Sequence, residues 1–384
     1  MKDQKWVAGW GTGCTTICMN HTEYFKDQTF RYVIYPTVDG SALRLHFSGR
    51  FNTEDSVITK AYVARRTTSS AVDTSTNTKI TFGGKDSLLI KAGELEVLSD
   101  EIPFVFHAGE EFTVSLYFAE MTQNMTGHSN NGYYVKKYYA KGDWAEAEDF
   151  PQDAWGENGP YCFLHTIDFL TQDDVSAIIA FGDSITAQPW PDCLARRLGE
   201  LGIKNRTVVR KGIGGNRILR DYTCRLKIHW GPAGIKRFEE DICQAGADRV
   251  FLLHGINDII HPGVNNRFCP MSELPTAEDM IERGYKYYIE TAHKHGMKIY
   301  LATILPCPRC MNDDGVREKI RLTVNEWIRT QKLSDGVIDF EAAVWNPANH
   351  QAILPEFDCG DHLHPSLMGA DYMAHSIPEV FFRN

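Results

Sequence analysis

The sequence predicts two domains, an antiparallel β-sandwich followed by an α/β domain with a mostly parallel sheet. Two observations predict this fold class: apolar residues alternate with a period of two before residue 172, and apolar strands alternate with helical segments after it. A length of 384 residues also suits two domains of ordinary size. We therefore expect a β-sandwich domain over 1–172 and an α/β domain over 173–384.

The first part of the chain reads as strands separated by turns. The stretches "ALRLHFSGRF" (42–51) and "FTVSLYF" (112–118) alternate apolar and polar residues, and "FGGKDS" and "HAGEEF" supply turns. Alternation of this kind predicts strands with one buried and one solvated face. An antiparallel β-sandwich is the simplest architecture for such strands.

The second part alternates strands with helices, which implies crossover helices and a largely parallel sheet. The clearest helix is predicted over Ala277–His295, because Thr276 can cap its start and Gly296 can end it. The candidate strands are "VSAIIAF" (175–181), "TVVR" (207–210), "RVFLLHG" (249–255), "KIYLATILP" (298–306) and "GVIDF" (336–340).

Composition excludes several classes of protein. A formal net charge of −10 without a Lys/Arg cluster argues against a nucleic-acid surface, and 43% apolar residues argue against disorder. The first residues, "MKDQKWVAGWGTG", form no apolar signal segment, and no run approaches the roughly 18 apolar residues that span a bilayer. We expect a cytoplasmic protein without membrane or nucleic-acid partners.

Ten cysteines are scattered along the chain, so we expect reduced thiols rather than a disulfide framework. The motif "CPRC", Cys307 to Cys310, has the spacing of half a zinc site or of a redox pair. Neither a second CxxC nor an HxxxH accompanies it, so a loop with incidental thiols is the favoured interpretation.

Small and polar residues follow three of the predicted strands. Carboxyl ends of parallel strands meet at one edge of a sheet, where ligands of α/β proteins bind. Each group alone has an ordinary explanation as a turn, a cap or a surface pair. The groups are Ser184 after the first strand, Gly212, Gly214, Gly215 and Asn216 after the second, Asn257 and Asp258 after the third, and Asp361 and His364 before the last helix.

Together these residues supply the parts that acyl transfer needs. A serine hydroxyl such as Ser184 needs an adjacent base, and the neutral imidazole of His364 can take its proton. Asp361, three residues earlier, can reach Nδ1 of that ring and fix its tautomer. The oxyanion then needs preset donors, for which Gly215, Asn257 and the backbone N–H of Ser184 are candidates.

The chain resembles the SGNH, or GDSL-type, esterases and acylhydrolases. Their four blocks read here "GDSI", "GIGG", "GIND" and "DHLH", in the family's order and spacing. Further stretches, among them "WPDCLARRL" and "ITFGGKDSLLIKAGELEVLSD", are similar to a branch with an N-terminal β-sandwich, so the resemblance covers nearly the whole chain. It implies a three-layer α/β/α hydrolase domain.

The resemblance also implies a role for each site residue: Ser184 as nucleophile, His364 as base, Asp361 as the acid that orients it, and Gly215 and Asn257 as oxyanion donors with Ser184. Gly212 and Gly214 compete with Gly215 for the glycine role. We interpret His362 as structural or substrate-contacting rather than as the base. Asp183 and Asp258, with Gly214, are expected to support the loops.

The sequence therefore predicts a serine esterase that removes short acyl groups, above all acetyl, from a carbohydrate, without a metal or an organic cofactor. Its partner would be a small-molecule or oligosaccharide ester, and whether it forms a homo-oligomer stays open. A lipid esterase or thioesterase is the first alternative, and a carbohydrate-binding protein without catalysis is the second. Fluorophosphonate labelling distinguishes the second from the enzymes.

Two features bear on the substrate. Only "AQP" separates Thr186 from Trp190, a shorter loop than in the branch that the chain resembles, and Trp190 is expected to narrow the acyl side. The polar stretches "GGNRILRDYTCR" and "HPGVNNRFCP" are expected to line the alcohol side. The aromatic residues Trp6, Trp10, Tyr133 and Tyr134 either seal the domain interface, which we favour, or bind a sugar.

Overall fold

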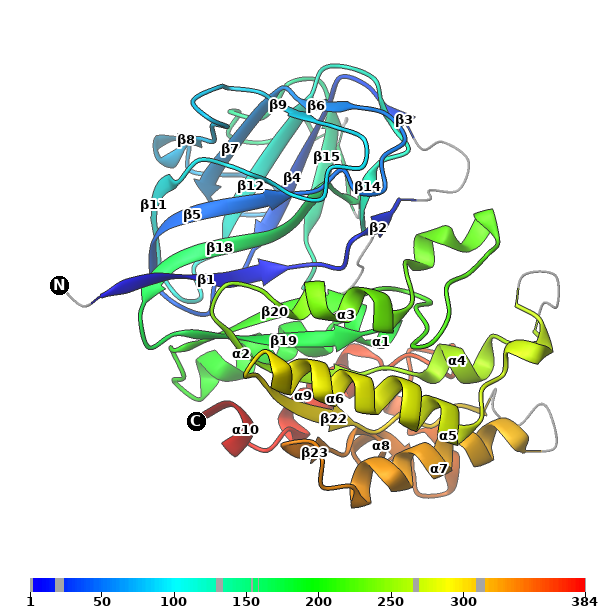
Figure 1. The fold of residues 1–384 in the computed structure, drawn as a ribbon. Coiled ribbons are helices and arrows are strands. Elements are labelled where there is room, and N and C mark those ends of the chain that lie inside the picture. The colour runs from blue at the N-terminus through cyan, green and yellow to red at the C-terminus, as the bar shows by residue number, and fades with distance from the viewer. Residues whose placement is uncertain are drawn as a thin grey trace. The chain divides into compact units, whose positions relative to one another are not determined.

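The computed structural model describes residues 3–17, 24–128, 134–152, 155–157, 159–264, 269–308 and 315–383. The chain folds into two compact units (Figure 1). The β-rich unit comprises Met1–Ser176 with Leu198–Val209, and the α/β unit comprises Ala177–Arg197 with Arg210–Asn384. The domain boundary predicted between residues 172 and 173 stays a prediction.

The β-rich unit contains two main antiparallel sheets, as the alternation predicts. One sheet consists of β1 (Gln4–Gly11), β18 (Leu164–Gln172), β5 (Gly40–Phe47), β10 (Val97–Leu98) and β11 (Ile102–Phe106). The other consists of β16 (Trp155–Glu157), β15 (Lys137–Lys141), β4 (Gln28–Ile34), β12 (Phe112–Phe118), β7 (Lys60–Arg65) and β8 (Thr78–Lys79). The ring of Phe112 lies 5.5 Å from that of Phe106 and 6.1 Å from that of Phe169, so aromatic packing joins the sheets into a sandwich.

Short sheets of two or three strands complete this unit. They are β2 (Thr15–Thr16) with β14 (Thr126–His128) and β17 (Tyr161–Cys162), β3 (Tyr24–Phe25) with β13 (Thr122–Gln123), and β6 (Ser56–Ile58) with β9 (Leu88–Ile90).

The solvated face predicted for β12 is wrong, because its polar residues Thr113 and Ser115 are buried. The neighbouring strand β4 carries Arg31, whose Nε donates to Ser115 Oγ at 2.9 Å. The same guanidinium donates to the carbonyls of Trp144 and Ala147 at 2.9 and 2.8 Å. Burial lowers the pKa of Arg31 to about 10. A loop fastened by this arginine therefore covers the outer face of the sheet.

The α/β unit is built around the five-stranded sheet that the sequence predicts. Its strand order is β20 (Arg206–Gly212), β19 (Ser176–Gly182), β21 (Ala247–Leu253), β22 (Lys298–Ala302) and β23 (Gly336–Ile338). The pairs β19–β21, β21–β22 and β22–β23 are parallel. Every residue of β19 is buried, which explains why its sequence is a continuous apolar run.

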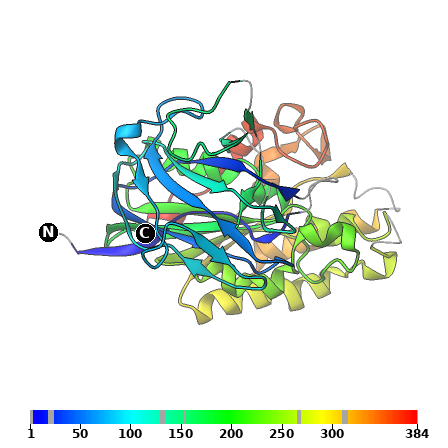
Figure 2. The ribbon, with the colours of Figure 1, turned by 90° about the horizontal axis from the view of Figure 1, so that it is seen from above.

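Helices lie on both sides of these strands. They are α1 (Ser184–Ala187), α2 (Trp190–Glu200), α3 (Gly234–Ile242), α4 (Ile256–Ile260), α5 (Ala277–Met280), α6 (Lys286–Lys294), α7 (Val316–Thr330), α8 (Phe340–Val344), α9 (Leu367–Ser376) and α10 (Val380–Arg383), with a hairpin of β24 (Trp345–Asn346) and β25 (Asn349–Ile353) after α8. Helix α3 contacts α6 and α5 contacts α7, whereas α8 contacts α9. In the view from above, yellow α6 and the orange-red chain after α8 lie on opposite sides of the parallel strands (Figure 2).

The helix predicted over Ala277–His295 is confirmed, with one irregularity. Thr276 and Asp279 form a reciprocal capping box at its start, and Gly296 follows its end with φ of +70°. A π-helical turn over Ile281–Tyr285 separates α5 from α6, which the sequence pattern does not predict. Among the described helices, none has the length and apolar content needed to cross a membrane.

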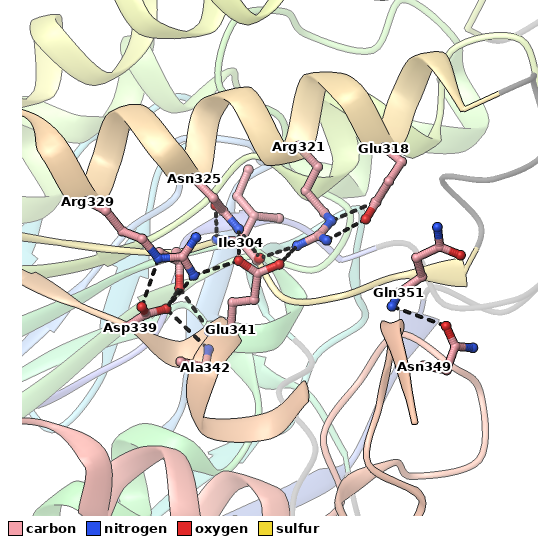
Figure 3. Close-up of polar contacts among 11 residues, drawn as sticks. Ile304, Glu318, Arg321, Asn325, Arg329, Asp339, Glu341, Ala342, Asn349 and Gln351 are labelled. Carbon is pink, nitrogen blue, oxygen red and sulfur yellow. Dashed lines mark hydrogen bonds and ion pairs between the residues drawn. The ribbon is translucent and has the colours of Figure 1, made fainter. Parts of the chain in front are cut away.

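A buried ion network fixes the chain that follows β22 (Figure 3). Arg321 of α7 is fully buried, donates to Glu318 at 2.6 and 2.8 Å, and pairs with Glu341 of α8. Arg321 and Asn325 donate to the carbonyl of Ile304 at 3.1 and 2.8 Å. The N–H of Ile304 in turn donates to Asn325 at 2.8 Å. Both backbone groups of Ile304 are therefore satisfied away from the sheet.

Replacing Arg321 with Met should destabilise the α/β unit by about 3 to 5 kcal/mol, because buried Glu318 would lose its cation and Glu341 would keep only Arg329. The measurement is the free energy of unfolding in urea. Arg283→Met is the control, since that exposed arginine lies 3.5 Å from Asp279 and its loss should cost less than about 1 kcal/mol. Equal losses in the two variants would contradict a structural role for the buried network.

Candidate active site

Ser184 begins α1 directly beyond the end of β19. A Cβ atom at Gly182 would lie 1.9 Å from the carbonyl oxygen of Leu253, so glycine lets the ends of β19 and β21 approach closely. Asp183 caps the short helix by accepting the N–H of Ile185 at 3.0 Å. The turn thus places the partly exposed Ser184 at the carboxyl edge of the sheet.

Ser184, His364 and Asp361 form a continuous chain of hydrogen bonds. Nε2 of His364 lies 2.8 Å from Oγ of Ser184, and Nδ1 lies 2.6 Å from Oδ2 of Asp361. The other carboxylate oxygen accepts the N–H groups of Leu363 and His364 at 2.9 and 2.8 Å. Burial works to raise the pKa of Asp361, but hydrogen bonds from His364 outweigh it and hold the pKa below its usual range. The ionised Asp361 accepts a hydrogen bond from the protonated Nδ1, so Nε2 carries no proton and can accept a hydrogen bond from Ser184.

His362 is directed to a different carboxylate. Its Nδ1 lies 2.8 Å from Asp358, and its side chain is 70% exposed, against 16% for His364. The backbone of His362 has φ of +61°, a value that is uncommon for residues other than glycine. The structure therefore brings His364, and not His362, to Ser184.

The glycines at and just after the end of β20 differ in their surroundings. Gly215 has φ of +75°, and a Cβ atom there would lie 2.3 Å from the ring of Trp230. A Cβ at Gly212 would lie 2.3 Å from the backbone nitrogen of Ala187 in α1. At Gly214 it would meet no atom within 4 Å. Gly215 is thus held against an aromatic ring, while its role as an oxyanion donor stays a prediction.

Asn257 lies in α4 and is joined to the same loop. Its side chain is 2% exposed, and its Nδ2 donates to the carbonyl of Asn216 at 3.0 Å. Asn216 follows Gly215 directly, so the two predicted oxyanion groups belong to one hydrogen-bonded loop pair. An amide carries two N–H donors, and this bond uses one of them.

The predicted support residues hold backbone in place. The carboxylate of Asp258 accepts the N–H groups of Ile218 and Leu219 at 2.6 and 3.1 Å. Asp183 accepts from Ile185 and also from the N–H of the glycine that precedes α4. Burial raises the pKa of Asp183 to about 7 and that of Asp258 to about 6. Both carboxyl groups face loop backbone.

Sequence reasoning missed Arg237, which lies in α3 and is 4% exposed. Its guanidinium donates to Asn216 Oδ1 at 3.0 Å, to the carbonyl of Gly182 at 2.7 Å and to that of Lys211 at 2.9 Å. With Asp241 it forms an i,i+4 ion pair at 2.6 Å, which in the sequence looks like an ordinary solvated pair on a helix. No local signal distinguishes it.

One expectation about the walls of the site is wrong, and the other stays a prediction. Trp190 is 1% exposed and packs edge-to-face 5.4 Å from Phe340, so it belongs to the core rather than to an open acyl wall. Arg217, within the stretch expected to line the alcohol side, is 2% exposed and donates to Glu273 at 2.7 Å. Residues 265–268 of the other stretch lie outside the described residues.

In the described part of the chain, the acidic and thiol groups of Asp358, Cys359 and Asp361 lie within 4.8 Å of one another, close enough to gather around a cation. The carboxylates, however, already bind the turn. Asp358 accepts from the backbone and ring of His362, and Asp361 accepts from those of His364. These contacts favour a structured turn over a metal site.

Other predicted features are only partly described. Cys307 is buried, whereas Cys310 lies outside the described residues, as does Tyr133. Trp10 packs edge-to-face on Tyr161 at 4.9 Å inside the β-rich unit. The roles suggested for the CPRC motif and for these aromatic residues stay predictions.

The model of the GDSL-like lipase/acylhydrolase family matches residues 180–372, half of the chain, and includes Ser184, Asn257 and His364. The chain belongs to this family. The SGNH hydrolase fold, with its parallel sheet between helices, and an activity on carboxylic esters follow from the match.

Several solved structures are similar to about half of the chain. A GDSL-like lipase from Bacteroides thetaiotaomicron is 20% identical over 53% of this chain and 87% of its own, with a TM-score of 0.37. A G-D-S-L family protein from Veillonella parvula is 18% identical over 55% and 100%, with a TM-score of 0.34. An acetyl xylan esterase from Geobacillus stearothermophilus is 18% identical over 53% and 94%, with a TM-score of 0.34. A search of curated proteins gave no match.

The two histidines provide a test of the site. His364→Ala should lower kcat on p-nitrophenyl acetate by about 10⁴-fold or more, because the Ser184 hydroxyl would lose its only adjacent base within the described residues. His362→Asn should keep at least about a tenth of the activity, since His362 contacts Asp358 instead, and Asn tolerates its positive φ. A reversed ranking of the two variants would contradict the assignment.

Proposed function

We propose that this chain is a serine esterase that removes short acyl groups, above all acetyl, from hydroxyl groups of a carbohydrate through an acyl-serine intermediate. The observation that carries the proposal is the hydrogen-bond chain from Asp361 through His364 to Ser184, with distances of 2.6 and 2.8 Å. Such a chain is the means by which a weakly nucleophilic hydroxyl is activated near neutral pH.

In the acylation step, Ser184 Oγ attacks the ester carbonyl carbon while its proton passes to Nε2 of His364. The carbonyl oxygen becomes an oxyanion, and Asp361 stabilises the imidazolium through Nδ1. When the tetrahedral intermediate collapses, the bond between the carbonyl carbon and the alcohol oxygen breaks. His364 returns the proton to the leaving alcohol, and the acyl group stays on Ser184.

Deacylation repeats these steps with water. His364 takes a proton from the water, whose oxygen attacks the acyl carbon and forms a second oxyanion. Collapse breaks the bond to Ser184 Oγ, and His364 returns the proton to the serine. The products are the carboxylic acid, the free alcohol and the unchanged enzyme.

In both steps the oxyanion would accept hydrogen bonds from the backbone N–H groups of Ser184 and Gly215 and from the side-chain amide of Asn257. Donors of this kind act best when they are fixed before the charge develops. Two contacts support such fixation: the amide of Asn257 is bonded to the carbonyl of Asn216, and Gly215 is packed against the ring of Trp230.

The polarity around His364 favours a hydroxyl-rich alcohol. The leaving alcohol must receive its proton from Nε2 of His364, so it lies next to the turn that carries this histidine. That turn is polar and open, with Asp361 40% and His362 70% exposed. Polar side chains in reach of solvent suit hydrogen bonds to sugar hydroxyls.

On the side of the site that would bind the acyl group, the segment after Ser184 is too short to form a long apolar groove. Only Gln188 and Pro189 connect α1 to α2, and Trp190 at the start of α2 is buried in the core. One observation favours the alternative of a lipid ester: Met368 and Tyr372, four residues apart on α9, are 60% and 52% exposed. A series of acyl chain lengths decides between the two substrates.

Ser184→Ala should lower kcat on p-nitrophenyl acetate by about 10⁴- to 10⁶-fold and abolish labelling by a fluorophosphonate, which reacts with an activated serine. The fold should persist, because Ser184 is partly exposed and its loss opens no cavity. Ser376→Ala, at the end of α9, is the matched control and should keep full labelling. If Ser184→Ala kept more than a tenth of the parent activity, the assignment of Ser184 as nucleophile would be wrong. If the fluorophosphonate did not label the parent protein, a binding protein without catalysis would be favoured.

For p-nitrophenyl esters from acetate to decanoate, kcat/KM should be greatest at two to four carbons and then fall, because a short acyl pocket excludes longer chains. Met368→Gln is the companion variant: it should leave the profile unchanged if α9 plays no part in acyl binding. If kcat/KM instead rose steadily up to acyl chains of eight carbons or more, the result would contradict the acetylesterase proposal and favour a lipid esterase.

A further inference from the structure

Within the proposed serine mechanism, on which this inference rests, we propose that Arg237 and Asn216 form a positioning pair that fixes the oxyanion donors relative to Ser184. Neither side chain would touch the reacting atoms. Their effect would pass through the backbone that carries Ser184 and Gly215 and through the amide of Asn257.

The guanidinium of Arg237 joins the ends of two strands. It donates to the carbonyl of Gly182, two residues before Ser184, at 2.7 Å and to the carbonyl of Lys211, four residues before Gly215, at 2.9 Å. These carbonyls lie at the carboxyl ends of β19 and β20. One rigid planar group thus sets the spacing between the strand that leads to the nucleophile and the strand that leads to the glycine donor.

Asn216 extends the connection to the third strand. Its Oδ1 accepts from Arg237 at 3.0 Å, and its Nδ2 donates to the carbonyls of Trp230 and Pro232, both at 2.7 Å. Its own carbonyl accepts from Asn257 Nδ2 at 3.0 Å. The side chain of Asn216 therefore anchors the backbone group that holds the amide donor, and it ties this group to the Trp230 segment on which Gly215 packs.

The surroundings favour a fixed, dry arrangement. Arg237 is 4% exposed and Asn216 is 1% exposed, and the guanidinium lies 4.1 Å above the ring of Phe181. His254 donates from Nε2 to the carbonyl of Asn216 at 3.2 Å, and burial holds the pKa of this histidine well below its ordinary value, so it stays neutral. Asp241 balances the charge of Arg237 at 2.6 Å. Hydrogen bonds inside such a low-dielectric site are directional and costly to break.

A lysine in place of Arg237 would keep the positive charge but lose the planar set of N–H donors. Arg237→Lys therefore tests the geometry of the guanidinium rather than its charge. We expect kcat on p-nitrophenyl acetate to fall roughly 10- to 100-fold with KM within about twofold of the parent. The affinity for methylboronic acid, which forms a tetrahedral adduct with an active-site serine, should fall by the same factor. The pH at half-maximal activity should not move, because neither Asp361 nor His364 contacts Arg237 in the described residues.

Arg321→Lys is the matched control, since Arg321 is an equally buried, ion-paired arginine of the same unit that holds the chain after β22. It should lower the stability but leave kcat unchanged. Equal losses of kcat in both lysine variants would assign the effect to general damage and overturn the proposal. Normal kcat in Arg237→Lys would also overturn it.

A double-mutant cycle identifies the route of the effect. Asn257→Ala alone should lower kcat by about 10² to 10³. If Arg237 acts through the oxyanion donors, Arg237→Lys should lower log kcat less in the Asn257→Ala background than in the parent protein. The fall in that background should be less than about half of the fall in the parent. Fully additive losses would contradict this route. Failure of the serine mechanism itself would appear separately, as activity retained in Ser184→Ala.

Discussion

The hydrogen bonds from Arg237 to the carbonyls of Gly182 and Lys211 hold two strand ends at one fixed spacing. A parallel sheet brings the carboxyl ends of its strands to one edge, but it does not fix the loops that leave that edge. In this chain the loops carry Ser184 and the glycine-rich turn, so their relative position depends on what binds the strand ends. A buried guanidinium suits this task because its donors are planar and cannot rotate independently.

Buried arginines have the same use elsewhere in the chain. Arg31 binds the carbonyls of the loop that covers the outer face of a β-sheet, and Arg321 binds the carbonyl of Ile304 after β22. Each guanidinium satisfies backbone carbonyls that would otherwise be buried without a donor. The desolvation of the cation is costly, and it is offset only where ion pairs and carbonyls surround it. Irregular backbone can therefore be buried at these places.

The turn before α9 separates the two neighbouring histidines by backbone conformation. Asp361 binds the N–H groups of Leu363 and His364 and the ring of His364, so it shapes the turn and orients this ring at once. The positive φ of His362 turns that residue toward Asp358. Only Leu363 separates the two histidines in sequence, yet the ring of His364 is bonded to Ser184 and the ring of His362 lies in solvent.

The sequence by itself determined the order of strands and helices, the four blocks and the pairing of Asp361 with His364, because these depend on hydrophobic periodicity and on spacing within one turn. The five strands of the parallel sheet and the alternating burial in β5 follow from the same local pattern. Where a local pattern allows a residue to be either buried or exposed, only the tertiary structure decided between the two. The polar face of β12 is buried because Arg31 fastens a loop over it, and Trp190 is in the core because Phe340 packs on it. Arg237 and Asp241 have the spacing of a solvated helix pair, and only the packing of α3 shows them to be buried at the strand ends. Burial depends on contacts between residues far apart in the chain, which no local pattern encodes.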